Sequence, residues 1–150
     1  MLSVIQRVSS ARVEVDGEIV GAIGQGLLVL VCAQPQDTAE TAQRLLHKLL
    51  RLRIFEDDAG KMNRSLQNLD GQGRHGGLLL VSQFTLAADT RSGTRPGFSG
   101  AAEPAMARAW FDDLVTQARA QHPEVAPGRF AADMKVHLVN DGPVTIPLNL

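Results

Sequence analysis

The stretch Ser82-Gln83-Phe84-Thr85 brings hydroxyl, amide and aromatic side chains together directly after the apolar run Leu78–Val81. Such a run indicates a buried strand, so these residues are expected at a strand end. Backbone N–H groups that the sheet no longer uses can stabilise a developing oxyanion there, and Phe84 can exclude water. The alternative, which the residue types alone favour, is an ordinary polar strand end with Phe84 in the core.

A second stretch, Asn140–Thr145, contains the dipeptide Gly142-Pro143 between two strand-like patterns. A Gly-Pro bond can be cis at a small free-energy cost, and two successive carbonyl oxygens would then point the same way. Such a rigid acceptor pair could hold an ammonium group and leave no room for a substituent on one side. The alternative is a routine hairpin turn, since Asp-Gly and proline are both common in turns.

Other kinds of side-chain catalysis have little support. The four histidines, His47, His75, His122 and His137, have no metal-binding spacing and accompany no GxSxG motif. The single cysteine, Cys32, follows an apolar run and is expected to be a small buried residue. We therefore expect neither a metal site nor a histidine-based triad.

The elements that must position these residues are mainly strands. Strand patterns occupy Leu2–Val8, Ala11–Val15, Glu18–Ile23, Leu27–Val31, Met134–Val139 and Val144–Leu148. Asp16-Gly17 predicts a hairpin turn between the second and third of them. The final segment is expected either to pair with its predecessor or to continue from it.

Two segments have helical spacing. In the first, Asp37 and Glu40 resemble a capping box, and Ala42, Leu45, Leu46, Leu49 and Leu52 then form an apolar face. The second begins near Pro104, which suits a first turn, and its predicted face consists of Ala107, Trp110, Phe111, Leu114, Val115 and Ala118. Trp110 is therefore expected in the core. The polar segment between Asp58 and Gly77 is expected to be a loop with one short helical turn.

Length and composition set the fold class. With 150 residues, 44% of them hydrophobic, the chain is expected to form one domain over residues 1–150. Many strands and two helices predict an α+β fold, with a curled, barrel-like sheet and two amphipathic helices outside it. The sequence has neither an apolar run of about 20 residues nor a signal-peptide pattern, so a soluble, cytoplasmic protein is expected.

Charge gives no sign of nucleic-acid binding through an overall field. Fifteen Lys and Arg residues against 16 Asp and Glu residues give a net charge of −1. The positive charges are unevenly placed, however. They gather in the first helix segment and in the loops around Ser82–Thr85, at Arg44, Lys48, Arg51, Arg53, Lys61, Arg64, Arg74, Arg91 and Arg95. A local basic rim is therefore compatible with the sequence.

Several further motifs occur in order along the chain. They are Ile5-Gln6-Arg7-Val8, Arg53-Ile54-Phe55 with Gly60-Lys61-Met62-Asn63, Leu86-Ala87-Ala88-Asp89-Thr90, Arg95-Pro96-Gly97-Phe98-Ser99 and Gly128-Arg129-Phe130-Ala131-Ala132-Asp133-Met134. Together with the two stretches above, they make the chain resemble the D-aminoacyl-tRNA deacylases (D-tyrosyl-tRNA(Tyr) deacylases) over essentially its whole length. Neither main motif departs from the family pattern.

The resemblance implies hydrolysis of the ester that joins a D-amino acid to the terminal adenosine of tRNA. Glycine mischarged on tRNA(Ala) would also be released, and neither a metal nor an organic cofactor is expected. Ser82, Gln83, Phe84 and Thr85 would form the catalytic stretch, with their backbone N–H groups lining the ester.

The resemblance further implies a homodimer in which Gly142 and Pro143 of one subunit enter the active site of the other. Their carbonyl oxygens would hold the α-amino group and exclude an L side chain. Arg7 would help to fix this pair, and Phe130 with Met134 would help to hold the adenine.

The sequence is compatible with alternatives in both mechanism and function. The vicinal 2′-hydroxyl of the terminal ribose could assist the attacking water, or Thr85 could act as a covalent nucleophile, although no general base is visible beside it. The enzyme could instead cleave other small acyl esters, which the near-neutral charge favours slightly. A module that binds RNA or a small ligand without turnover is the third reading.

Overall fold

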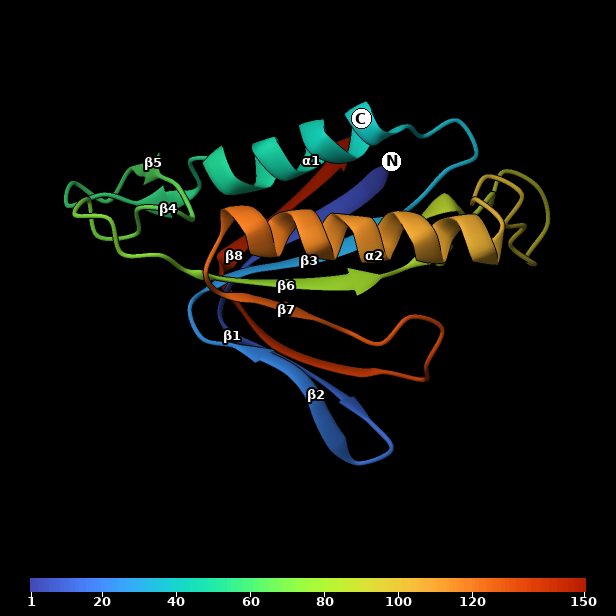
Figure 1. Cartoon of the computed structure of the whole chain (residues 1–150), viewed down its shortest axis with the longest axis horizontal. Coiled ribbons are helices and arrows are strands. Elements are labelled where there is room, and N and C mark those ends of the chain that lie inside the picture. The colour runs from blue at the N-terminus through green and yellow to red at the C-terminus, as the bar shows by residue number, and fades with distance from the viewer.

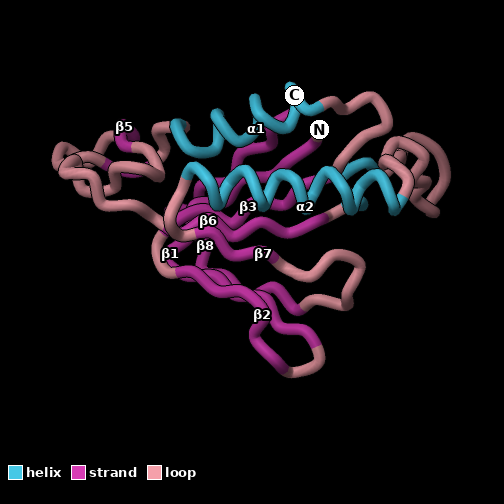
Figure 2. Tube along the Cα trace, in the orientation of Figure 1, coloured by secondary structure: helices cyan, strands magenta, loops and turns pink.

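The computed structural model describes residues 1–150 and contains eight strands, two α-helices and one short 3-10 helix. The strands are β1 Leu2–Val15, β2 Glu18–Ile23, β3 Gly26–Cys32, β4 Phe55–Glu56, β5 Met62–Arg64, β6 Gly77–Ser82, β7 Val125–Pro127 and β8 Lys135–Asn149. The helices are α1 Ala39–Arg51, η1 Phe84–Ala87 and α2 Pro104–Gln121. Both α-helices lie side by side on one face of the sheet (Figures 1 and 2).

The main sheet runs in the order β2-β1-β3-β6-β7, and β8 pairs with β1. β3, β6 and β7 are mutually parallel, whereas β1 is antiparallel to β2, β3 and β8. The sheet curls until its two ends nearly meet, because a Cβ atom at Gly21 in β2 would lie only 2.5 Å from the carbonyl oxygen of Pro127 in β7. Only glycine permits that approach. The predicted α+β fold with a curled, barrel-like sheet and two outer helices is confirmed.

β1 differs from the prediction of two strands, Leu2–Val8 and Ala11–Val15. It is one strand whose first half pairs with β3 and whose second half pairs with β2, while β8 follows it along the other side. Ser9 and Ser10, where the partner changes, are exposed. The apolar pattern is interrupted there because the neighbouring strand is exchanged, not because β1 ends.

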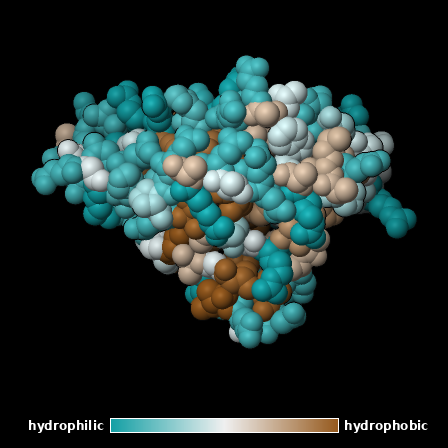
Figure 3. Space-filling model, in the orientation of Figure 1, coloured by the Kyte–Doolittle hydropathy of each residue, from teal (hydrophilic) through white to brown (hydrophobic).

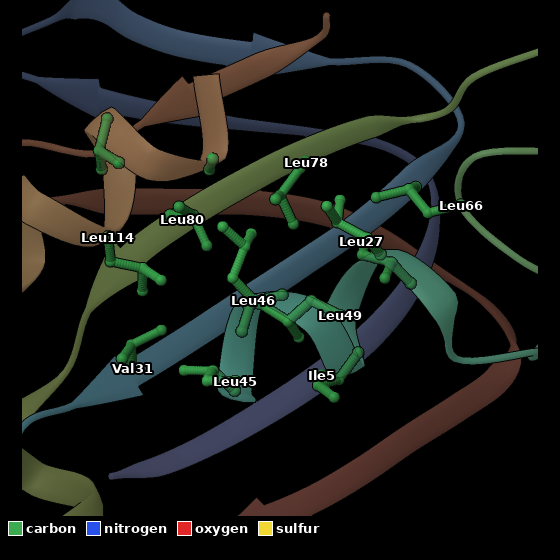
Figure 4. Packing of buried hydrophobic residues seen from close by; sticks show 14 of the residues in the cluster. Ile5, Leu27, Val31, Leu45, Leu46, Leu49, Leu66, Leu78, Leu80 and Leu114 are labelled. Carbon is green, nitrogen blue, oxygen red and sulfur yellow. The ribbon is translucent and has the colours of Figure 1, made fainter. Parts of the chain in front are cut away.

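The continuous apolar runs of β3 and β6 are buried on both faces, as expected for covered parallel strands. Leu27, Val29 and Val31 of β3, with Leu78 and Leu80 of β6, belong to the core under the helices. The alternate residues, among them Leu28, Leu79 and Val81, form a second core inside the curl of the sheet. Figure 4 shows the first core, where Leu45, Leu46 and Leu49 of α1 and Leu114 of α2 meet the two strands.

The start of α1 differs from the predicted capping box of Asp37 and Glu40. Thr38 is the N-cap, and its side chain accepts a hydrogen bond from the N–H of Thr41, whose own hydroxyl accepts from the N–H of Thr38. Asp37 is instead buried against the amino group of Met1, at 2.6 Å. At the other end Leu52 lies beyond the helix as its C-cap, and Leu50 takes the expected place in the buried face.

α2 begins at Pro104, as predicted, and buries Phe111, Leu114, Val115 and Ala118. Trp110 is half-buried and packs against the edge of the core. No helix of the structure is both long enough and apolar enough to span a membrane.

Two connections also differ from the predictions. The segment expected to be a loop with a helical turn between Asp58 and Gly77 contains strand β5, which pairs with β4 in a separate small sheet. The stretch Asn140–Thr145 is not a hairpin turn, because β8 runs through it and pairs with β1 on both sides. The strand-like patterns before and after it are therefore parts of one strand.

Candidate active site

The Ser82–Thr85 stretch lies where β3 and β6 end side by side, with Ser82 paired to Val31. The ladder extends one residue further than expected, since the N–H of Gln83 donates to the carbonyl of Val31 at 2.8 Å. The N–H of Gln83 is therefore not free. The chain then turns into η1, and the first N–H groups of such a turn, those of Phe84 and Thr85, have no acceptor within it.

A cavity of about 660 Å³ opens at this strand end. Seventeen of its 21 lining residues are hydrophobic. Ser82, Gln83 and Phe84 form one wall, and Ala107 and Trp110 of α2 form another. A cavity of this size and lining accommodates a nucleoside-sized ligand.

Thr85 does not line the cavity. Its hydroxyl instead accepts a hydrogen bond from the side-chain amide of Gln83. Phe84 is 56% exposed, so its placement in the core is wrong, and its ring meets that of Phe98 edge-on, with 5.1 Å between centroids. The two phenylalanines form part of the rim.

The loop between β7 and β8 also lines the cavity, through Phe130 and Met134. The Phe130 ring is held between α2 residues: its centroid lies 6.2 Å from that of Phe111, and the guanidinium of Arg108 lies 4.7 Å from it. Met134 packs so close to Gly128 that a Cβ atom there would come within 2.8 Å of its sulfur. Both residues thus present apolar surface to the cavity.

Ionisable side chains are scarce in the cavity. Only Cys32 and Glu103 line it, and none of the four histidines does. Cys32 is buried, with its sulfur 3.6 Å from the Phe84 carbonyl oxygen, and burial raises the pKa of its thiol. A thiol with a raised pKa stays protonated at neutral pH and is a poor nucleophile. The cavity therefore has no histidine base among its lining residues.

The Gly142-Pro143 pair lies in a bulge of β8. Val8 pairs with Asn140 and Gln6 with Thr145, so Asp141–Val144 together face the single residue Arg7 of β1. The Gly142–Pro143 peptide bond is cis, and both residues are exposed.

Hydrogen bonds of the Asn140 side chain join the two ends of this bulge. The Asn140 amide donates to the Thr145 hydroxyl at 2.8 Å, and its oxygen accepts from the N–H of Val144 at 3.2 Å. The bulge is therefore a built feature of β8 and not an open loop.

Arg7 of the neighbouring strand β1 holds the bulge in place. Its side chain is 7% exposed, and it donates to the carbonyls of Asp141 at 3.0 Å and Ile54 at 2.8 Å. Glu56 and the Asp141 carboxylate each lie 3.7 Å from the guanidinium. Gly142 has φ +126°, and a Cβ atom there would come within 2.9 Å of both Arg7 Nη2 and Val144 Cγ2. Only glycine therefore fits at position 142.

The two motifs do not meet within one chain. Arg7 pairs with Leu27, near the start of β3, whereas Ser82 pairs with Val31 at its end. The two positions are separated by roughly 13 Å along the strand direction. The structure thus brings Ser82, Gln83, Phe84, Phe130 and Met134 to one cavity and leaves Arg7, Gly142 and Pro143 elsewhere.

Sequence reasoning missed part of the cavity. Phe98 and the segment Ala101–Pro104 ahead of α2 also line it. The only signal for these residues was the Arg95–Ser99 motif. Trp110 was expected only in the core, but it also lines the cavity.

Comparisons with known proteins identify the family of the chain. A family model described as D-Tyr-tRNA(Tyr) deacylase matches residues 4–149. Proteins named D-aminoacyl-tRNA deacylase from Delftia acidovorans and Acidovorax ebreus are 65% and 66% identical over 150 residues, covering all of this chain and 96% and 98% of theirs.

A solved structure of a protein named c-Myc DNA Unwinding Element Binding Protein superposes with a TM-score of 0.91 at 38% identity, covering 100% of this chain and 99% of that one. Family match, curated relatives and fold all span nearly the whole chain. The chain therefore belongs to the D-Tyr-tRNA(Tyr) deacylase family and is a hydrolase of the D-aminoacyl-tRNA deacylase type.

Proposed function

We propose that the chain hydrolyses the ester of D-aminoacyl-tRNA, and of glycyl-tRNA(Ala), to free tRNA and the amino acid. The observation that carries this proposal is the apolar cavity at the end of β6, which is lined by Phe84 and by no histidine, with the acceptor-free N–H groups of Phe84 and its neighbour Thr85 at the start of η1. Such a site suits an ester whose carbonyl oxygen needs donors and whose proton transfers are handled by the substrate itself.

In the proposed reaction, water attacks the ester carbonyl and the two N–H groups stabilise the oxyanion. The vicinal 2′-hydroxyl takes up the proton of the water and relays a proton to the departing 3′-oxygen. The carbonyl–oxygen bond to the ribose then breaks, which leaves the free carboxylic acid and the tRNA 3′-hydroxyl. Positioning and oriented donors supply the acceleration, with no covalent enzyme intermediate.

Phe130 and Met134 are proposed to hold the terminal adenine. Both line the same cavity as Ser82–Phe84, and the Phe130 ring already packs against Phe111 and Arg108 of α2. A base between apolar and aromatic groups is held by stacking, which tolerates the absence of polar partners.

Chiral selection is proposed to come from a second subunit. Gly142 and Pro143 are exposed and firmly anchored, yet lie too far from the cavity of their own chain. In a symmetric dimer each pair would enter the other cavity, where its carbonyl oxygens accept from the α-ammonium group and its backbone blocks an L side chain. The edge strand β8, which pairs with β1 alone and exposes 56% of Val139, supports an interface on this side.

Covalent catalysis by Thr85 is the competing mechanism. It has less support because the Thr85 hydroxyl lies outside the cavity and is bonded to an amide, which is not a base. Hydrolysis of other small esters and binding without turnover are the remaining alternatives.

The test is hydrolysis of matched D- and L-aminoacyl-tRNA, with glycyl-tRNA(Ala) and a 3′-D-aminoacyl-adenosine alongside. We expect the D and glycyl esters to be cleaved and the L ester spared. Equal cleavage of D and L esters would contradict chiral selection. Cleavage of simple esters but not of aminoacyl-tRNA would favour the small-ester alternative, and tight binding of D-aminoacyl-tRNA without turnover would favour the binding module.

A further inference from the structure

A groove adjoins the cavity and, unlike the cavity, is lined by several arginines. It has a volume of about 360 Å³ and lies between α2 and the loop after β7. Phe111 and Phe130 line both hollows, so the groove begins where the proposed adenine wall ends. Its polar rim is formed by Arg108, Arg119 and Arg129.

The three arginines of this groove are not neutralised by carboxylates. Arg108, Arg119 and Arg129 are exposed and take part in none of the ion pairs of the chain. One carboxylate, that of Asp112, also lines the groove, which leaves an excess of positive charge in a chain whose net charge is −1. Guanidinium groups gathered in a concave surface attract anions, and phosphate is the anion that their fork geometry fits best.

The spacing of these residues suits an extended anion rather than a single phosphate. Arg108 and Arg119 lie on one stripe of α2, because eleven residues correspond to nearly three full turns and a rise of roughly 16 Å. Arg129 lies across the groove, on the loop between β7 and β8. A chain of phosphates that leaves the cavity past Phe130 would meet Arg108 first and Arg119 last.

We infer that this arginine groove, formed by Arg108, Arg119 and Arg129, binds the phosphates of the tRNA strand immediately 5′ of the terminal adenosine. The inference rests on the proposed function, since that function places the adenosine against Phe130. The groove gives the affinity for tRNA that the overall charge does not, through contacts that fix position without reading sequence.

A rival exit leads past Arg91 and Arg95, on the loop between η1 and α2. Arg91 is already neutralised there by Asp89, which accepts from its guanidinium at 2.7 Å and 2.9 Å. Arg95 is exposed but does not line either hollow. The arginine groove therefore presents more unpaired charge to an emerging strand than this loop does.

The test compares the double variant Arg119→Gln/Arg129→Gln with the parent on D-aminoacyl-tRNA and on 3′-D-aminoacyl-adenosine. Arg108 stays unchanged because it also supports Phe130. We expect KM for the tRNA substrate to rise at least about tenfold, kcat to be retained and nucleoside hydrolysis to be unaffected. The slope of log(kcat/KM) against log salt should fall by roughly one, since two phosphate contacts to a single strand are lost.

Two single variants serve as controls. Arg44→Gln removes an exposed arginine from α1, outside both hollows, and should leave the KM for tRNA unchanged. Arg95→Gln tests the rival exit. An unchanged KM for tRNA in the double variant, an equal loss on both substrates, or a larger effect of Arg95→Gln would each overturn the inference.

The affinity for uncharged tRNA separates this inference from the proposed function. If the parent cleaved neither substrate, the proposed function would fail, and filter binding of uncharged tRNA would then judge the groove alone. A loss of affinity in the double variant, absent in Arg44→Gln, would support the groove, and equal affinities would overturn it.

Discussion

The cavity at the end of β6 and the bulge of β8 are built in opposite ways. Apolar side chains from several segments enclose the cavity, whereas the bulge projects exposed backbone from an edge strand. Few polar side chains line the cavity, whereas the bulge is held by hydrogen bonds from the side chains of Arg7, which is buried, and Asn140. Figure 3 shows apolar surface reaching the exterior below α2, over the β1–β2 end of the sheet.

This contrast separates two tasks. In the proposed function the cavity binds and activates the ester, but a pocket lined mainly by apolar side chains has no rigid polar feature with which to tell one hand of an α-carbon from the other. The bulge has such a feature, since its backbone is fixed by Arg7, but it has no room to hold a nucleoside. The proposed function therefore requires both regions, and within one chain they lie apart.

The change of largest expected effect removes the bulge and leaves the cavity intact. Gly142→Ala places a Cβ atom within 2.9 Å of Arg7 Nη2 at φ +126°, so the backbone must move. We expect single-turnover cleavage of D-aminoacyl-tRNA to fall by about 100-fold or more, as displacement by an ångström can do. The melting temperature should show that the fold survives.

Gly17→Ala is the matched control for this variant. Gly17 also has a positive φ, +80°, but a Cβ atom there would meet nothing within 4 Å. Both variants should lose stability, by about 1–3 kcal/mol, because of the strained backbone. If Gly142→Ala kept parental activity, or Gly17→Ala lost as much, the role of the bulge would be refuted.

The next largest effect tests the cavity. A substrate whose terminal ribose lacks the 2′-hydroxyl should be cleaved about 100-fold to 10,000-fold more slowly, because no histidine is present to replace that hydroxyl in proton transfer. Its binding should change little. Equal rates on the deoxy and ribose substrates would eliminate substrate assistance.

A smaller effect is expected where the bulge is only loosened. Arg7→Lys keeps the charge, but a lysine ammonium group lacks the planar guanidinium that bonds the carbonyls of Asp141 and Ile54 at the same time. Cleavage of D-aminoacyl-tRNA should therefore fall by about tenfold. Arg12→Lys, on the same strand but in an exposed pair with Glu14, should change little. Equal effects of the two changes would show that Arg7 has no special role.

The smallest effect is expected from the hydroxyls. Thr85→Ala and Ser82→Ala should stay within about tenfold of the parental rate, because the stretch acts through backbone N–H groups in the proposed mechanism. A fall of Thr85→Ala to the uncatalysed rate, with the fold intact, would restore covalent catalysis by threonine.

Much of the fold could be predicted from periodicity. The runs of β3 and β6 and the face of α2 were predicted because burial selects apolar residues at fixed spacing. The start of α1 was not, since Asp37 and Thr38 are both good caps and only tertiary structure shows that Asp37 is taken by the Met1 amino group. The continuity of β1 was missed because its partner strands change at Ser9 and Ser10.

The site was harder to predict than the fold. Ser82–Phe84 could be placed at a strand end from the preceding apolar run, but the walls around them come from segments distant in sequence, such as Phe98 and Trp110. The bulge was ambiguous because Asp-Gly-Pro fits a turn as well as an interrupted strand. A turn and an interrupted strand are distinguished only by the structure, in which β8 pairs with β1 both before Asp141 and after Val144.

In the proposed dimer one functional site combines the cavity of one subunit with the bulge of the other, and mixing two differently disabled subunits is the sharpest experiment on this arrangement. Gly142→Ala disables the bulge, and Ala107→Trp fills the cavity from α2. Each variant alone should be inactive, and a refolded 1:1 mixture should regain about one quarter of the parental rate, since half of the dimers are mixed and each of these has one complete site of two. A mixture no more active than its components would contradict the shared site.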